Sequence, residues 1–232
     1  MWLDKFKFKT LLKKKTPFSY NRFNDGEWQI ISNISKTFRR EYSFKRHVPS
    51  HQSFRKQLES ALKHQGDSYY VGMVDKRIKH GTYYTEMIQS ANQPTRNTTS
   101  AVLFTNENYK FYMNNIYPIY TLYTNIVMIC NPEVNIKKLS FSKNVKYVVN
   151  TPPPNAWEKL PGIQSQLDSI IDTIPSHTLF LFSAGPISKV LIKNSYIKND
   201  THTYIDVGSL HDLITGLGKS RGYLKQIPNL DI

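Results

Sequence analysis

Short apolar runs alternate along this chain with segments of helical periodicity, and this alternation constrains the fold more than any other feature. Residues 124–130 form a continuous apolar run, which is typical of a strand buried on both faces. Residues 52–64 and 162–174 carry apolar side chains at the spacing of one helix face. Alternating strands and helices favour an α/β, Rossmann-like fold, a mainly parallel sheet with helices on both faces.

The remaining segments fit the same pattern. A helix is expected over 28–36, a helix or turn through 109–111, and further helices after Pro186 and Gly208, while the polar segment 89–100 is interpreted as a loop. Further strands are expected at 18–23, 69–74, 101–104, 146–149, 178–182 and 204–207. We expect residues 1–17 to form a basic N-terminal arm and residues 18–232 to form a single domain.

Charge and cysteine content narrow the function. The 232 residues include 31 Lys and Arg against 17 Asp and Glu, a net charge of +14 that implies an anionic partner. The single cysteine, Cys130, excludes an internal disulfide and a cysteine-rich zinc site, and its apolar surroundings indicate a buried structural thiol. Without an apolar leader or a run of eighteen apolar residues, the chain is expected to be cytoplasmic, with no signal peptide or transmembrane segment.

The N-terminal segment allows two interpretations. Residues 1–15 mix large apolar side chains with lysines, a composition that suits peripheral contact with an anionic membrane. The same pattern also suits an edge strand or a short helix packed on the domain, and the sequence leaves both open.

The first segment that could carry chemistry follows the strand at 18–23. Asp25 and Glu27 stand two residues apart around Gly26, so in a turn both carboxylates could hold one Mg²⁺ or Mn²⁺ ion. Arg22, on the preceding strand, could bind a phosphate oxygen. The alternative is a surface turn leading into a helix, with Asp25 as its cap and Glu27 in its first turn.

Two later segments stand at the ends of predicted strands. Ser183 and Gly185 precede a helix that carries Lys189, so a phosphate could approach backbone N–H groups there; the alternative is an ordinary strand-to-helix turn. Asp206 and Ser209 follow the last strand, where Asp206 could accept a sugar hydroxyl, act as a base or cap a helix. Residues 216–220 resemble the end of a P-loop, but Leu213 stands where that motif requires glycine.

In their order along the chain, these segments resemble the GT-D-fold glycosyltransferases, a bacterial and viral group with an Asp-x-Glu motif near the N-terminus. Asn24 stands where that family generally has glycine, and because asparagine tolerates left-handed backbone angles we expect the turn to survive. The resemblance spans roughly residues 18–212 and rests on segments 20–28, 100–111, 155–157, 183–189 and 205–209.

The resemblance implies a metal-dependent, hexosyltransferase-type enzyme of glycan biosynthesis. It would use a nucleotide-sugar donor, expected to be a UDP-sugar, and a hydroxyl of a glycan or glycoconjugate as acceptor. Asp25 and Glu27 would hold Mn²⁺ or Mg²⁺, and Asp25, Glu27 and Asp206 would form the catalytic set. The donor would be bound by Arg22, Gly26, Asn155, Ser183, Gly185, Lys189 and Ser209. Asp206 and Asp212 are both candidates for a general base.

Two other classes of function stay open. A nucleic-acid-binding protein would explain the charge and the fifteen tyrosines, with Lys13–Lys15 and Arg39–Arg40 as its densest basic clusters. The other basic residues are scattered along the chain, so no specific nucleic acid is expected. A transferase-like fold without activity, kept as a structural protein, is the third interpretation.

Overall fold

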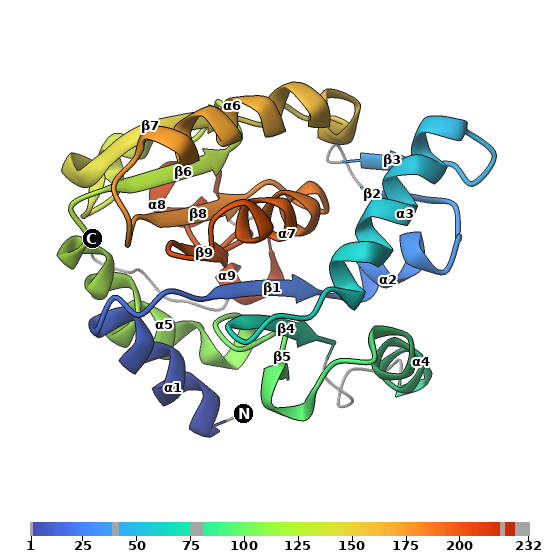
Figure 1. Ribbon diagram of the computed structural model, residues 1–232, viewed down its shortest axis with the longest axis horizontal. Coiled ribbons are helices and arrows are strands. Elements are labelled where there is room, and N and C mark those ends of the chain that lie inside the picture. The colour runs from blue at the N-terminus through green and yellow to red at the C-terminus, as the bar shows by residue number, and fades with distance from the viewer. Residues whose placement is uncertain (1, 39–41, 75–80, 219–220, 226–232) are drawn as a thin grey trace.

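The computed structural model describes residues 2–38, 42–74, 81–218 and 221–225. Within them, seven strands form one sheet in the order β5-β4-β1-β9-β8-β6-β7, and every neighbouring pair is parallel (Figure 1). A separate antiparallel pair joins β2 to β3. The strands are β1 (Ser19–Phe23), β2 (Lys36–Phe38), β3 (Tyr42–Phe44), β4 (Tyr69–Met73), β5 (Thr98–Ser100), β6 (Ile126–Cys130), β7 (Val145–Asn150), β8 (Leu179–Ser183) and β9 (Thr203–Asp206).

Helices connect the parallel strands and cover the sheet, as such crossovers require. The α-helices are α1 (Trp2–Lys13), α2 (Asp25–Ile31), α3 (Pro49–Lys63), α4 (Gly81–Ala91), α5 (Tyr109–Asn115), α6 (Leu160–Thr173), α7 (Ile187–Lys198), α8 (Asp212–Thr215) and α9 (Gly222–Lys225). Short 3₁₀ turns are η1 (Thr95–Asn97), η2 (Asn106–Asn108), η3 (Tyr117–Leu122), η4 (Ile136–Lys138), η5 (Ser142–Asn144) and η6 (Ala156–Lys159). The predicted Rossmann-like α/β fold is confirmed.

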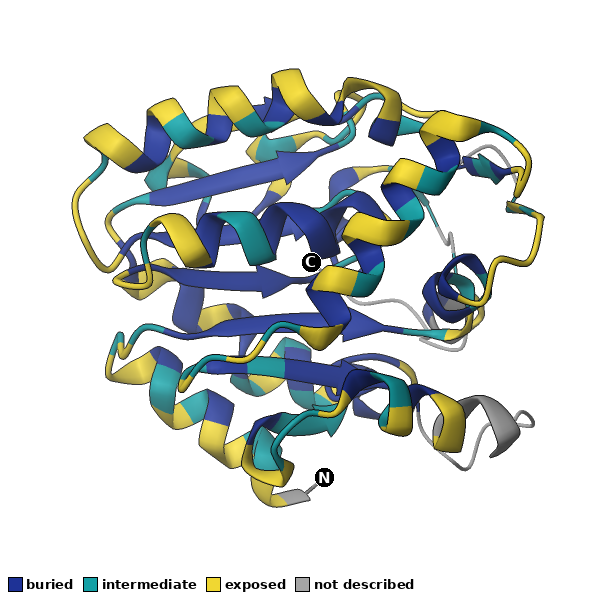
Figure 2. Cartoon of the chain, turned by 45° about the vertical axis from the view of Figure 1, so that its right-hand side comes forward, coloured by how far each residue is buried: buried dark blue, intermediate teal, exposed yellow. Residues whose placement is uncertain are grey.

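Two apolar cores lie on opposite faces of the sheet. One packs α2, α3, α4, α6 and α7 against the sheet, and the other packs α1, α5, α8 and α9 against its reverse side. Side chains of β8 alternate between them, with Phe180 and Phe182 in the first core and Leu179 and Leu181 in the second. The central strands are therefore buried on both faces, as Figure 2 shows and as the apolar run 124–130 predicts.

The prediction of a strand at residues 101–104 is wrong. Residues Thr98–Ser100 pair with β4 instead, and the chain then leaves the sheet in turns, with the Leu103 N–H donating to the Ser100 carbonyl. All four side chains from Ala101 to Phe104 are nevertheless buried. The apolar run reports burial correctly, but burial in a turn region leaves the same sequence signal as burial in a short strand. Likewise, the segment 89–100 expected as a loop contains the end of α4, η1 and β5.

The helix expected over 28–36 lies earlier in the chain. It begins at Asp25 and ends at Ile31, so Asp25 and Glu27 belong to its first turn. Asn24 precedes it with φ −104° and ψ −172°, an extended conformation rather than the left-handed one expected there. Asn24 is thus an ordinary helix N-cap, and its N–H donates to Glu27 Oε2 at 3.0 Å.

The N-terminal segment is a helix that packs on the sheet. Phe8 and Leu12 of α1 are fully buried, and the Phe8 ring contacts Phe18, Tyr20 and Tyr70. Lys7 and Lys13 are exposed on its outer side, and Lys14, which directly follows the helix, is also exposed. Residues 2–13 thus form a short helix packed on the domain, and contact of its exposed side with an anionic membrane stays a prediction.

Two further sequence expectations concern Cys130 and the membrane. Cys130 is buried at the end of β6, and burial raises the pKa of its thiol to about 11, which fits a structural role. No helix within the described ranges combines the length and the apolar character that a bilayer span requires.

Candidate functional site

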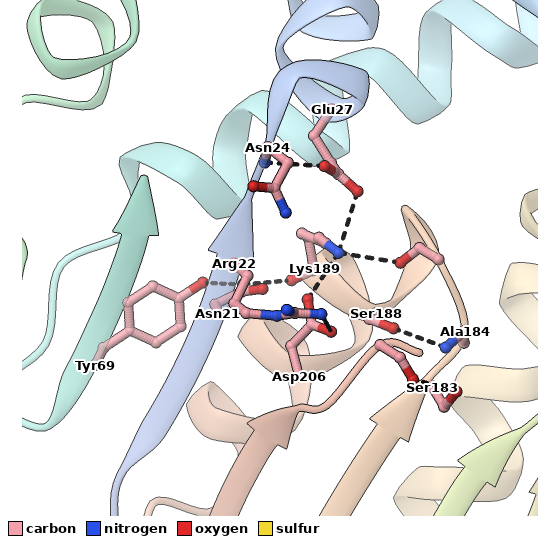
Figure 3. A network of polar contacts seen from close by, with 12 residues as sticks. Asn21, Arg22, Asn24, Glu27, Tyr69, Ser183, Ala184, Ser188, Lys189 and Asp206 are labelled. Atoms are coloured by element: carbon pink, nitrogen blue, oxygen red, sulfur yellow. Dashed lines mark hydrogen bonds and ion pairs between the residues drawn. The ribbon is translucent and has the colours of Figure 1, made fainter. Parts of the chain in front are cut away.

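Four charged side chains meet at the carboxyl edge of the sheet (Figure 3). Arg22 comes from β1, Glu27 from α2, Lys189 from α7 and Asp206 from the end of β9. Lys189 Nζ lies 2.7 Å from Asp206 Oδ2 and 3.1 Å from Glu27 Oε1, and Arg22 Nη2 lies 3.2 Å from Asp206 Oδ1. The parallel topology puts the carboxyl ends of β1 and β9 side by side and so brings the four residues together.

This cluster is buried and electrically balanced. Exposed side-chain fractions are 1% for Asp206 and 4% for Lys189, and two cations face two carboxylates. Burial alone would raise the pKa of Asp206, but the charges of Lys189 and Arg22, and the hydrogen bonds from both, hold it below its ordinary value. Asp206 is therefore a carboxylate at neutral pH, with each of its oxygens held by a cation.

Neighbouring groups fix the positions of the two cations. Asn21 donates to the Lys189 carbonyl at 2.9 Å and to the Tyr69 hydroxyl at 2.7 Å, which ties α7 to β1 and β4. Gly208 has φ +50°, and a Cβ added there would collide with the Arg22 guanidinium. Only glycine lets the chain after β9 pass so close to this guanidinium.

Two adjoining pockets open above the cluster. The larger, about 420 Å³, contains the charged cluster together with Asp25 and Lys36. The smaller, about 170 Å³, lies at the carboxyl ends of β6, β7 and β8. Both are lined by Tyr42, Gly185, Pro186, Gly208, Ser209 and Arg221. The edge of the sheet therefore offers one bipartite site of a size that suits an extended small molecule.

Nearly all of the predicted site residues line these pockets. The larger pocket takes in Arg22, Asp25, Gly26, Glu27, Gly185, Lys189, Asp206 and Ser209, and the smaller one takes in Ser183, Gly185, Ser209 and Asp212. A Cβ added at Gly26 would stand 2.7 Å from the Tyr42 hydroxyl. Glycine at this position therefore leaves room for the Tyr42 side chain, which lines both pockets. Asn155 differs from the expectation, because its side chain faces β3 and accepts the Ser43 N–H at 2.8 Å, while its neighbours Ala156 and Trp157 line the smaller pocket.

Asp25 and Glu27 do not form the convergent pair of metal ligands that a turn would have allowed. Side chains two apart in a helix point roughly 200° away from one another. Glu27 is already engaged by Lys189 and by the Asn24 N–H, whereas Asp25 is exposed at the larger pocket. Among the described residues, no three His, Cys, Asp or Glu side chains are grouped to hold a metal. What the site offers is one accessible carboxylate, which suits a Mg²⁺ or Mn²⁺ ion that also takes phosphate oxygens.

Several residues that line the pockets were not predicted from the sequence. Lys36 and Tyr42 come from the β2–β3 pair, Asn131 and Thr151 directly follow β6 and β7, and Arg221 precedes α9. Asn131 and Thr151 could have been found, because Asn131 directly follows the predicted strand 124–130 and Thr151 stands two residues after the predicted strand 146–149. Lys36, Tyr42 and Arg221 reach the site through connections that leave no local sequence signal.

Comparisons with solved structures identify this architecture. One structure, described as "The highly conserved domain of unknown function 1792 has a distinct glycosyltransferase fold", matches with a TM-score of 0.62 and 15% identity over 89% of this chain and 77% of that one. The chain has a glycosyltransferase-like fold. A selenomethionine-substituted structure of the domain of unknown function 1792 matches with a TM-score of 0.63 and 13% identity over the same shares of the two chains. No family model and no curated protein matches the sequence.

A glycosyltransferase-like fold fits the position of the site. In parallel sheets of this class, ligands bind outside the carboxyl ends of the strands, and both pockets lie there. At such low identity the likeness extends to the fold alone, so the assignment of residues rests on the geometry of this chain.

Proposed function

We propose that this protein is a glycosyltransferase of the GT-D type that moves a hexosyl group from a UDP-sugar to a hydroxyl of a glycan or glycoconjugate. The observation that carries the proposal is the bipartite pocket at the carboxyl edge of a glycosyltransferase-like fold, with paired cations at its floor. Arg22, Lys36, Lys189 and Arg221 face Asp25, Glu27 and Asp206 in the larger pocket, so one positive charge is in excess. An anionic diphosphate suits this balance.

The donor diphosphate is proposed to lie where the two pockets join, between Gly185 and Gly208. The first turn of α7 begins there, and its backbone N–H groups and dipole favour negative charge. Arg221 contributes to both pockets, while Lys189 and Arg22 lie beneath. As the leaving diphosphate gains charge, these preorganised donors stabilise it without having to move.

A divalent ion, Mn²⁺ or Mg²⁺, would supply Lewis-acid neutralisation of the two phosphates when it is bound. Asp25 is the residue proposed to hold it, and the exposure of its carboxylate at the larger pocket supports this assignment. Glu27 would have to release Lys189 before it could join as a second ligand. We therefore propose Asp25 as the metal ligand and Glu27 as the residue that positions Lys189.

Asp206 is proposed to position cations rather than to take a proton. Each of its oxygens is held by Lys189 or Arg22, and its lowered pKa makes it a weak base. Its function in the proposal is to keep both cations fixed at the floor of the pocket. Of the two candidates for a general base, Asp206 and Asp212, we therefore propose Asp212, which lines the smaller pocket.

Contact with an anionic membrane is a separate part of the proposal. The outer face of α1 carries exposed Lys7 and Lys13, exposed Lys14 directly follows the helix, and Leu3 and Phe6 are exposed on the same helix. Such a face could hold the protein beside a lipid-linked acceptor. Charge reversal of the three lysines should abolish binding to phosphatidylserine vesicles in a flotation assay; unchanged binding would exclude this face.

Release of UDP from a panel of UDP-hexoses, with Mn²⁺ and with added glycan acceptors, tests the proposed activity. Asp25→Asn should reduce the rate by about a hundredfold or more, because electrostatic stabilisation of the leaving group is lost. Asp67→Asn is the matched control, since Asp67 has a side chain 99% exposed and paired with Arg96 away from both pockets. Full activity in Asp25→Asn would contradict the metal assignment, and no release from any donor would favour the structural-protein interpretation.

A further inference from the structure

The smaller pocket differs in chemistry from the larger one. Among its lining residues, Tyr42, Pro153, Ala156, Trp157, Ile187 and Leu217 provide apolar surface. Asp212 and Arg221 are its charged members, so its formal charges balance. The uncharged and flat part of a ligand would be favoured here, whereas phosphate would be favoured toward the cations, where this pocket joins the larger one.

Two residues that line the smaller pocket, Thr151 and Trp157, each carry a buried polar side-chain atom without a hydrogen-bond partner among the described residues. Thr151 is 4% exposed and Trp157 is 5% exposed, and within the described part of the chain neither Thr151 Oγ1 nor Trp157 Nε1 has a hydrogen-bond partner. Buried polar groups are nearly always paired in folded proteins, so each such exception requires an explanation. A ligand with acceptors and donors along its edge would satisfy both.

Ring contacts and a backbone hydrogen bond hold Trp157 and Thr151 in place. The Trp157 ring stacks on Phe54 with centroids 5.0 Å apart and contacts Tyr42 and His51 at 5.8 and 5.4 Å. Thr151 continues from β7, and its N–H donates to the Cys130 carbonyl at 2.9 Å. A preformed pocket of this kind loses little entropy when a rigid ring enters.

The size of the pocket limits what it can hold. At about 170 Å³ it is smaller than the roughly 300–1,000 Å³ of sites that take a whole drug-sized ligand. It therefore receives one part of a larger molecule, whose remainder continues past Gly185 and Gly208 into the larger pocket.

We infer that the smaller pocket binds the nucleoside of the donor, with the edge of its base at Thr151 and Trp157. The diphosphate then crosses between Gly185 and Gly208, and the sugar lies in the larger pocket beside Asp25. This inference rests on the proposed function and adds to it the orientation of the donor. It also assigns nucleotide selectivity to residues that follow β6 and β7, which stand two and three strands away from β9 in the sheet.

Titration calorimetry of the whole chain in the presence of Mn²⁺, with UDP, CDP, GDP, ADP and inorganic pyrophosphate as ligands, tests the inference. The wild type should bind one nucleoside diphosphate more tightly than pyrophosphate. Thr151→Val, which removes only the hydroxyl, should lower the affinity for that nucleotide by about threefold to tenfold, as expected for the loss of one hydrogen bond. Ala156→Phe should fill the pocket and abolish the preference over pyrophosphate. Pyrophosphate affinity should stay unchanged in both variants.

Thr203→Val is the matched control, because Thr203 is equally buried but begins β9 at the opposite, amino edge of the sheet. Unchanged nucleotide affinity in Thr151→Val and Ala156→Phe would overturn the inference and leave the proposed function standing. A wild type that binds nucleotide no better than pyrophosphate would also overturn it, because the nucleoside would then make no contact. A wild type that binds none of the five would overturn the proposed function and the inference together.

Discussion

Lys189 contacts both buried carboxylates of the site, and its ammonium sets the charge balance of the cluster. Without it, Glu27 and Asp206 would be left with Arg22 alone to compensate two negative charges. Removing one partner from a buried ion pair costs more than the pair itself contributes, because the remaining charge keeps its desolvation penalty.

Lys189→Met should therefore lower the free energy of unfolding by about 3–5 kcal/mol. Asp25→Asn, at an exposed carboxylate, should change it by less than about 0.5 kcal/mol. Urea denaturation at pH 7 measures both. Equal stabilities for the two variants would mean that Lys189 is not engaged as the structure shows.

Buried histidines make the stability of the fold sensitive to acid. Burial lowers the pKa of His211 to about 3, and burial, aided by the charge of His177, lowers that of His202 to about 4. In the unfolded chain both pKa values return to about 6.5. Between these limits the unfolded state binds protons that the folded state does not, so stability is complete above pH 6.5 and is lost as the pH falls.

The free energy of unfolding should consequently fall between pH 6.5 and pH 4. Each buried imidazole contributes up to about 1.4 kcal/mol per pH unit. His211→Gln should reduce the slope by that amount and keep a partner for the Tyr112 hydroxyl, which lies 2.6 Å from His211 Nε2. Urea titrations at several pH values measure it, and an unchanged slope in the variant would show that His211 is not buried in its neutral form.

Among the elements, α1 shows that a basic segment can belong to the core. Phe8 is 1% exposed and lies in an aromatic cluster with residues of β1 and β4, whereas Phe6 on the same helix is 40% exposed. Four of the twelve residues of α1 are lysines, yet Phe8 and Leu12 on its inner face are as buried as the side chains of the central strands.

Phe8→Ala should destabilise the protein by about 3–5 kcal/mol through loss of apolar burial and the cavity left behind. Phe6→Ala, its matched control on the same helix, should cost less than about 1 kcal/mol. Thermal or urea unfolding compares them. Similar small losses in both variants would indicate that α1 is detached from the sheet in solution.

Element by element, the sequence predicts the strands better than the connections. The run 124–130 and the helix 162–174 are recovered because periodicity reports directly on burial. The predictions for residues 101–104 and 28–36 are wrong. A buried turn leaves the same apolar pattern as a short strand, and the end of α2 followed by β2 leaves the pattern of one longer helix. The Asn24–Glu27 segment is a helix start because Asn24 caps it, and that choice between turn and helix is made by local hydrogen bonds.

At the scale of the whole molecule, the order of the strands brings the site together. Arg22 and Asp206 are 184 residues apart and form an ion pair because β9 inserts beside β1. The charged residues themselves were predicted from the sequence as separate candidates, but their pairing was not, because strand order has no local signal. Arg39 and Arg40, one of the two dense basic clusters, lie outside the described residues, and so do Lys219 and Ser220 of the P-loop-like segment.

The net charge of +14 leaves nucleic-acid binding as an alternative function of the whole molecule. Non-specific binding of that kind releases counterions, so it should weaken steeply between 50 and 200 mM salt. A donor whose diphosphate meets only the few cations of the pocket would lose far less affinity over that range. Salt dependence therefore separates the two classes of ligand in one series of measurements.

Thermal unfolding with and without UDP, at 150 mM salt and with or without Mn²⁺, tests the central claim most directly. A ligand that binds only the folded state raises the melting temperature by mass action. At a concentration a hundredfold above its dissociation constant, it adds about 2.7 kcal/mol to the free energy of unfolding. We expect a rise with UDP that requires Mn²⁺, that is lost in Asp25→Asn and that persists in Asp67→Asn. No rise with UDP or another nucleoside diphosphate, with or without metal, would contradict the account.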